Sequence, residues 1–146
     1  MAIDKSGKWW VGKTPEDLQE YLDAFSEDSY PIHEFRLARC DCGSLEFQIE
    51  ASDEDGVARR TCAACRQKHF LCDSEENWSD AETKRWRCTA CKSRVANVAA
   101  GFALTEDRQA IHWLYVGERC VGCGVLGCLT SWKIGYSPSL QLMDLV

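Results

Sequence analysis

Alternating apolar and polar positions predict a β-hairpin in the middle of the chain. Between residues 45 and 51 polar side chains separate the apolar ones, which is the pattern of a strand with one buried and one solvated face. The apolar positions of this strand are Leu45, Phe47, Ile49 and Ala51. An acidic run that ends in a glycine, residues 52–56, predicts a turn. We expect the chain to return as a second strand from Val57 to Thr61.

A second hairpin is predicted further along the chain, and it is apolar on both faces. Its first strand spans residues 98–104, where apolar side chains alternate with alanine and glycine, and its second strand spans residues 111–116. Such a hairpin must be covered on both sides. We expect the first hairpin and the amino-terminal segment to cover it. The alternative cover is a partner protein or a second copy of the chain.

The amino-terminal segment carries the signals of one helix and one strand. Thr14 is expected to be the N-cap of a helix that runs from Pro15 to Phe25, with acidic residues in its first turn. Leu18, Tyr21, Leu22 and Phe25 form its apolar stripe, which we expect to lie in the core. Pro31 ends the helical region, and residues 32–38 are predicted to form a strand.

Four pairs of cysteines flank the predicted hairpins. They are Cys40/Cys42, Cys62/Cys65, Cys88/Cys91 and Cys120/Cys123. The sequence around the first pair is echoed around the third, and each such half ends with one further cysteine, Cys72 or Cys128. Two thiolates at a tight turn can bind one tetrahedral metal ion, and two such turns complete a four-sulfur site. The repeat therefore predicts two structural metal ions.

Ten cysteines in 146 residues would also suit a small disulfide-rich secreted protein. The spacing argues against disulfides, because a C-x-x-C pair is too close to its neighbour to link distant parts of the chain. No cationic and apolar signal segment precedes residue 30, and no apolar run has membrane-spanning length. We therefore expect metal binding, no membrane contact and a reducing cytoplasm.

The cysteine pairs can be joined in three ways: sequentially, through the two middle pairs, or interleaved. The internal repeat favours sequential pairing, because a duplicated unit should carry its own metal. The expected ligand sets are Cys40, Cys42, Cys62 and Cys65 for one ion and Cys88, Cys91, Cys120 and Cys123 for the other. Zinc is the expected metal, with iron left open.

These elements predict a small, metal-stapled α+β fold with two tandem antiparallel β units and an amino-terminal helix. The expected divisions are residues 1–38 for the helix and lead-in strand, residues 39–86 for the first unit, and residues 87–146 for the second unit with its carboxy-terminal extension. Each unit can bury only a small core. Metal removal should therefore unfold the protein, because the free energy of ligation contributes to folding.

Charge indicates the kind of partner. The formal net charge is −6, and two tetrathiolate sites around divalent ions would bring it to about −10. Acidic residues cluster in residues 14–35, which contain no lysine or arginine, and again in residues 73–82. Such a surface repels phosphate and favours a protein partner with a basic surface. Self-association remains an alternative.

The basic residues lie close to the cysteine pairs. They are Arg39, Arg59, Arg60, Arg66, Lys68, Arg85, Arg87, Lys92, Arg94 and Arg119. We interpret them first as local neutralisation of the two metal centres. The alternative is a basic face for nucleic acid, interleaved with Trp86 and Trp113.

Nothing in the sequence predicts catalysis. His33, His69 and His112 lie in no recognisable hydrolase or deaminase motif, and a four-cysteine zinc site has no open position for substrate. His69 is at most a substitute ligand, and redox chemistry by a lone C-x-x-C is disfavoured because the motifs come in matched pairs. Cys72 and Cys128 are expected to be buried and inert, with mutual pairing or exchange with a ligand as alternatives.

At these cysteines the chain resembles the zinc-ribbon superfamily with rubredoxin-like knuckles, over about residues 39–128. Cys42-Gly43 and Cys123-Gly124 match the knuckle glycine, whereas the Cys40/Cys42 spacing is one residue short. The closing stretch, residues 119–128, also looks like small bacterial proteins of unassigned function. The resemblance implies metal-stapled ribbons, and the size and acidity are similar to those of bacterial immunity or adaptor proteins. We therefore expect a non-enzymatic protein-binding role, with nucleic-acid association second and redox chemistry third.

Overall fold

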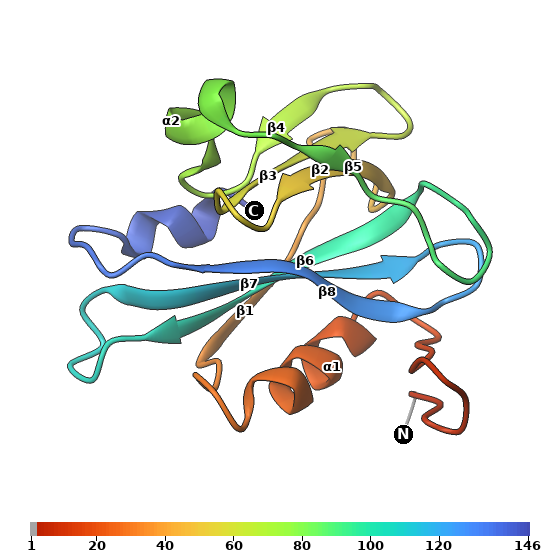
Figure 1. Cartoon of the computed structure of the whole chain (residues 1–146), viewed down its shortest axis with the longest axis horizontal. Helices are drawn as coiled ribbons and strands as arrows, with labels where there is room; N and C mark the ends of the chain where they lie inside the picture. The colour runs from red at the N-terminus through yellow and green to blue at the C-terminus, as the bar shows by residue number, and fades with distance from the viewer. Residues whose placement is uncertain (1–2) are drawn as a thin grey trace.

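One antiparallel sheet runs through both cysteine-bearing halves of the chain. The computed structural model describes residues 3–146, and the strand order along the sheet is β4-β3-β2-β6-β7-β8, with β1 also paired to β6 and β5 to β2 (Figure 1). The strands are β1 (Glu34–Leu37), β2 (Phe47–Ser52), β3 (Val57–Cys62), β4 (Lys68–Phe70), β5 (Lys84–Arg85), β6 (Ala96–Leu104), β7 (Ile111–Cys120) and β8 (Leu126–Lys133). The helices are α1 (Asp17–Ser26), the short α2 (Ser74–Asn77), and the 3-10 turns η1 (Trp78–Asp80) and η2 (Leu140–Asp144). The predicted small α+β class is confirmed at this level.

Both predicted hairpins are present. In the first, β2 pairs with β3 through the acidic turn, whose Gly56 has a φ of 66° that favours glycine. In the second, β6 pairs with β7, and β7 continues to Cys120 before β8 pairs along it. The two hairpins meet where Phe47 of β2 pairs with Ala96 of β6. The two halves of the chain therefore share one sheet.

The start of α1 differs from the prediction. The helix begins at Asp17 rather than Pro15, and the side chain of Thr14 does not cap it. The chain enters through a tight turn in which the backbone N–H of Asp17 bonds to the carbonyl of Thr14 at 3.1 Å. The carboxylate of Asp17 reaches back instead and accepts from the backbone N–H groups of Lys13 and Thr14 at 2.7 and 3.0 Å. The helix therefore has no side-chain N-cap, and the acid in its first turn fixes the chain that enters it.

The second hairpin is covered on both faces. On one face, Leu22 of α1 lies against Gly101 and Gly117, and Leu18 packs with Ala99. The small residues of β6 and β7 are what allow the helix to approach the sheet closely. Figure 1 shows α1 on one side of these strands and the first hairpin on the other. Phe25 was expected in the core but is 50% exposed, because it lies at the edge of this contact with its ring edge-on to Tyr115 of β7.

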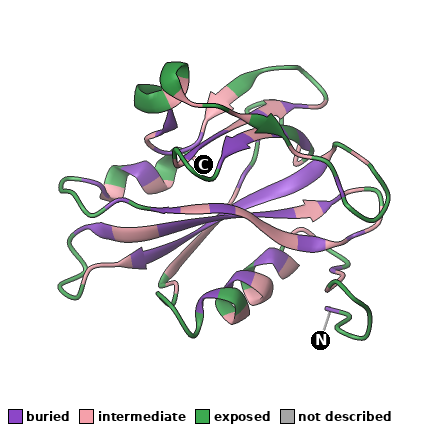
Figure 2. Cartoon of the chain, in the orientation of Figure 1, coloured by how far each residue is buried: buried purple, intermediate pink, exposed green. Residues whose placement is uncertain are grey.

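The opposite face holds the main core. Phe47 of the first hairpin, Phe102, Leu114 and Val116 of the second, and Trp132 of β8 belong to one buried cluster, which appears as the purple centre of the sheet in Figure 2. The carboxy-terminal segment adds Leu140, Leu142, Met143 and Val146 to this cluster. The sequence pattern did not predict that contribution. No helix formed by residues 3–146 is long and apolar enough to cross a membrane.

Candidate metal centres

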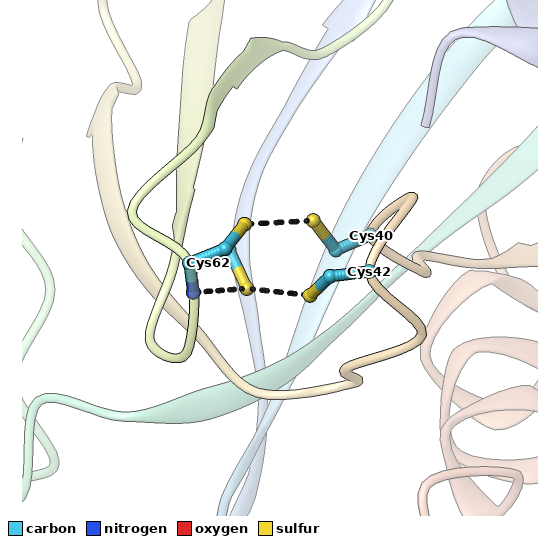
Figure 3. Close-up of side chains that lie close together, drawn as sticks. Cys40, Cys42 and Cys62 are labelled. Carbon is cyan, nitrogen blue, oxygen red and sulfur yellow. Dashed lines mark hydrogen bonds between the residues drawn. The ribbon is translucent and has the colours of Figure 1, made fainter.

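The first four-sulfur group lies where the turn after β1 meets the end of β3. The Sγ atoms of Cys40 and Cys65 are 3.5 Å apart, and those of Cys42 and Cys62 are 3.6 Å apart. All four sulfurs lie within 4.8 Å of one another. Figure 3 shows the side chains of Cys40, Cys42 and Cys62 converging from the two turns. The group is the one expected from sequential pairing.

The second group repeats this arrangement at the start of β6 and the end of β7. The Sγ atoms of Cys88 and Cys123 are 3.6 Å apart, those of Cys91 and Cys120 are 3.4 Å apart, and all four lie within 4.8 Å of one another. A Cβ added to Gly122 would lie 3.2 Å from the Sγ of Cys91. Glycine at this position therefore leaves room for the sulfur cluster.

The sulfur geometry fits a tetrahedral metal ion. Four sulfurs at about 2.3 Å from a central zinc ion would lie about 3.8 Å from each other, close to the observed spacings. A disulfide would bring two sulfurs to about 2.05 Å, and all ten cysteines are free thiols in this structure. Both groups could hold a metal ion, and four thiolates at each would leave no position for substrate.

All four turns share one backbone hydrogen-bond pattern. The carbonyl of the first cysteine accepts from the N–H of the residue after the second cysteine, at 2.8 to 3.0 Å. The N–H of the first cysteine donates to a carbonyl two residues beyond the second, also at 2.8 to 3.0 Å. The donors of the first bond are Gly43, Arg66, Lys92 and Gly124. The Cys40/Cys42 turn closes both bonds although it is one residue shorter.

The residue after each second cysteine adopts a left-handed conformation. Its φ is 94° at Gly43, 69° at Arg66, 70° at Lys92 and 80° at Gly124. Glycine occupies only two of these positions, so the sequence indicated the left-handed residue in only two of the four predicted turns. Arg66 and Lys92 take the same conformation without a glycine, which shows that closure of the turn imposes it locally.

Backbone N–H groups lower the pKa of selected thiols. The N–H of Cys65 contributes most to lowering the pKa of Cys62 to about 6, and it lies 3.5 Å from that sulfur. Burial raises the pKa of Cys88, but the N–H groups of Cys91 and Ala90 outweigh it and bring the pKa to about 7. A thiolate is the form that binds metal, so each centre contains a thiol whose surroundings favour the ligating state.

Arg60 is a buried basic residue next to the first four-sulfur group. Its side chain is 6% exposed, lies 4.6 Å from the ring of Phe47, and donates to the carbonyl of Val146 at 2.8 Å and 3.1 Å. Burial lowers the pKa of this guanidinium, whereas the neighbouring Cys40 and Cys62 raise it. Arg60 therefore places a positive charge next to the thiols of the first group, an arrangement compatible with local neutralisation.

The second centre is linked to the amino-terminal segment by Arg119. Its guanidinium donates to the carbonyls of Gly12 and Lys13 and to the side-chain oxygen of Asn97, at 2.9 to 3.0 Å. Asn97 in turn donates to the carbonyl of Leu45 in the first half of the chain at 2.8 Å. This network fixes three segments beside Cys120.

The histidines are not members of either sulfur group, although His69 lines a pocket together with Cys40. His33 accepts from the backbone N–H of Leu104 at 2.9 Å, and His112 packs edge-on against Tyr30. His69 pairs with Arg60 across β3 and β4, and burial and the charge of Arg60 lower its pKa. Neither four-sulfur group includes His69. The three histidines are not brought together.

Cys72 and Cys128 also lie outside the two groups. Cys72 is buried in the main core and points to the carbonyl of Leu142 at 3.4 Å, whereas Cys128 points to the carbonyl of Thr130 at 3.5 Å. Burial is the main cause that raises the pKa of each to about 12. Both thiols are therefore protonated at neutral pH and react slowly.

Serine at Cys72 or Cys128 is expected to leave both metals in place, because neither thiol belongs to a four-sulfur group. In the metal-loaded wild type, iodoacetamide at pH 8 should modify neither of them, since a pKa near 12 leaves almost no thiolate. Elemental analysis and peptide mass mapping would measure both effects. Loss of a full metal equivalent in either variant would show that the ligand sets are wrong.

The fold and the two sulfur groups define a small α+β protein with two candidate tetrathiolate metal centres. Comparison of the chain with protein-family models, with curated proteins and with solved structures finds no match. Its function is therefore argued from its own residues.

Proposed function

We propose that this chain is a non-enzymatic tandem zinc-ribbon protein that holds two structural zinc ions and acts by binding another protein. The observation that carries the metal assignment is the pair of closed four-sulfur groups, each with the spacing of a tetrahedral site. Each group flanks one hairpin, β2-β3 or β6-β7, as a ribbon unit does. Iron fits the same ligands, and a purified protein without the visible colour of ferric tetrathiolate would exclude it.

The protein-binding part of the proposal rests on an aromatic groove beside α1. Trp9, Trp10, Tyr21, Phe25 and Leu126 line a cavity of about 350 Å³. Trp9 and Phe25 are 38% and 50% exposed, and Tyr21 stacks on Phe25 with ring centroids 6.0 Å apart. Exposed aromatic side chains next to a cavity are typical anchors of protein interfaces. Phe25 is positioned by α1 and packs against Tyr21 and Tyr115, whereas Trp9 comes from the segment before the helix.

Acidic side chains lie on the helix that forms one side of this aromatic groove. Glu16, Glu20, Asp23 and Glu27 lie on or next to α1; Glu20 pairs with Lys5 at 4.0 Å, and Lys8 lines the groove itself. The first turn of the helix is acidic, and its last turn has no basic residue. The charge pattern therefore favours a basic partner segment with an apolar anchor, as expected for an immunity or adaptor role in a reducing compartment.

The second acidic run, residues 73–82, is less available for binding a partner. Asp73 accepts from the indole N–H of Trp132 at 3.1 Å and from the hydroxyl of Tyr136 at 2.9 Å, so it is engaged within the fold. Glu75 and Glu76 of α2 are exposed and have no ion-pair partner within residues 3–146. They provide a matched control surface for the acidic groove.

Selection of a random peptide library on the metal-loaded protein should enrich sequences that combine lysine or arginine with an aromatic residue. The double variant Glu20→Lys/Asp23→Lys is expected to slow association of these peptides about tenfold at low salt, with a smaller effect at high salt. Phe25→Ala should accelerate their dissociation. Surface plasmon resonance would measure both rates.

Glu75→Lys/Glu76→Lys reverses the same number of charges on α2, away from the groove, and is expected to change association much less. Equal slowing by the two double variants would indicate only a net-charge effect. Failure to enrich any peptide that depends on Phe25 would reject the groove as a binding site.

A further inference from the structure

A small basic pocket lies beside the first hairpin, on a different surface from the aromatic groove. Gln48 of β2, Thr61 of β3, Lys68 of β4, Arg85 of β5, and Trp86 and Arg94 of the following segment line it. Its volume is about 130 Å³. Residues from both halves of the chain therefore meet around a space that suits a small group.

The pocket has an excess of positive charge. Lys68, Arg85 and Arg94 are exposed, and none of them forms an ion pair with any of residues 3–146. One carboxylate, that of Glu50, also lines the pocket, but it is bound to Arg59 at 2.8 Å. Three positively charged side chains thus line the pocket, and the carboxylate beside them is already paired. This excess of positive charge occurs in a chain whose net charge is −6.

Neutral hydrogen-bonding groups and an aromatic ring complete the lining. Neither Gln48 nor Thr61 has a side-chain hydrogen bond to another described residue, so their amide and hydroxyl groups can donate to a ligand. The backbone N–H of Trp86 bonds to the carbonyl of Ile49 at 2.8 Å, and its ring packs partly against the main core. The indole is therefore held in place next to the cations.

Arg59 and Arg60 do not take part in this site. Arg59 is paired with Glu50 and lies over the ring of Trp78 at 4.5 Å, and Arg60 is buried near the first sulfur group. Trp113 is also elsewhere, stacked on Tyr30. Of the basic face considered from the sequence, Lys68, Arg85, Trp86 and Arg94 therefore line this pocket, whereas Arg59, Arg60 and Trp113 do not.

We propose that this pocket binds the phosphate of a nucleotide, with the base against the ring of Trp86. Guanidinium groups bind phosphate oxygens through paired, charge-assisted hydrogen bonds, and an indole offers a stacking surface to any base. The acidic surfaces elsewhere on the molecule disfavour a long polyanion. The nucleotide is either free or the end of a short single strand, and the same pocket would bind its phosphate in both cases.

Titration calorimetry of the metal-loaded protein with AMP, ribose 5-phosphate and a single-stranded thymidine decamer would test the proposal. AMP is expected to bind at least about fivefold more tightly than ribose 5-phosphate, because only AMP has a base to stack. Saturable binding of AMP identifies a free nucleotide, and binding of the decamer alone identifies a strand.

The Arg85→Gln and Arg94→Gln variants are each expected to weaken binding about tenfold, which is the loss of one charge-assisted hydrogen bond. Both side chains are exposed, so these variants should keep their fold and metal. Arg108→Gln is the matched control, since Arg108 is an exposed arginine in the turn at the far end of β6.

No saturable binding of AMP or the decamer, or an equal loss in Arg108→Gln, would overturn the proposal. Equal affinity for AMP and ribose 5-phosphate would reject the role of Trp86.

Discussion

Replacing Cys62 by serine is expected to remove one metal equivalent and to unfold the first half of the chain. The sulfur of Cys62 is fully buried, faces that of Cys42 at 3.6 Å, and accepts from the N–H of Cys65. Three remaining thiolates cannot close the tetrahedral site. Structural zinc contributes about 10–16 kcal/mol to the folding of zinc-finger peptides at neutral pH, which is as large as the whole net stability of a typical domain, about 5–15 kcal/mol.

Elemental analysis of the purified variant and its circular dichroism spectrum would measure these effects. Cys72→Ser is the matched control, because Cys72 is also a buried cysteine, 6% exposed, but lies outside both sulfur groups. It should lose some stability through core packing while keeping both metals. A Cys62→Ser variant that kept two metal equivalents and the wild-type spectrum would contradict the metal assignment.

The shared sheet determines how much of the fold is lost when one metal ion is removed. Cys62 ends the six-residue β3, whose outer neighbour is the three-residue β4, whereas Cys120 ends the ten-residue β7, which pairs with the long strands β6 and β8. Loss of the first metal therefore releases mainly short strands, but Cys120→Ser releases a strand that contributes Leu114 and Val116 to the main core. We expect Cys120→Ser to lose the near-ultraviolet dichroism of the whole protein, and Cys62→Ser to retain part of it.

Much of the local structure follows from short-range sequence signals. Strict alternation around Phe47 and Ile49 predicted β2, and the small and apolar residues of β6 predicted a strand buried on both faces. The strand predictions depend on residues that are close together in the sequence. Which thiols come together followed instead from the internal repeat, because the facing sulfurs belong to cysteines 20 to 35 residues apart.

The features that were missed depend on distant parts of the chain. The carboxy-terminal η2 had no periodic pattern, yet Leu142 and its neighbours complete the main core. The basic pocket combines Lys68 with Arg94 across the sheet, and no spacing in the sequence indicates that contact. Tertiary packing decided each of these, and local propensity carries little information about it.

Leu22→Ala is expected to lower the free energy of unfolding by about 2–5 kcal/mol, the usual range for a buried leucine. Leu22 is fully buried, and its side-chain atoms would lie 3.1 to 3.3 Å from a Cβ added at Gly117. Alanine leaves a cavity there, because Gly101 and Gly117 have no side chains that could fill the space. Chemical denaturation of the metal-loaded protein would measure the change.

Gln19→Ala is the matched control, since Gln19 lies on the solvent side of the same helix and its replacement should change stability by no more than about 0.5 kcal/mol. Gly117→Ala tests the same contact from the sheet, because the added methyl group would press on Leu22 and destabilise the wild type. In the Leu22→Ala background that methyl group should instead fill the cavity and recover part of the loss. Additive destabilisation by the two substitutions would show that α1 is not packed on these glycines.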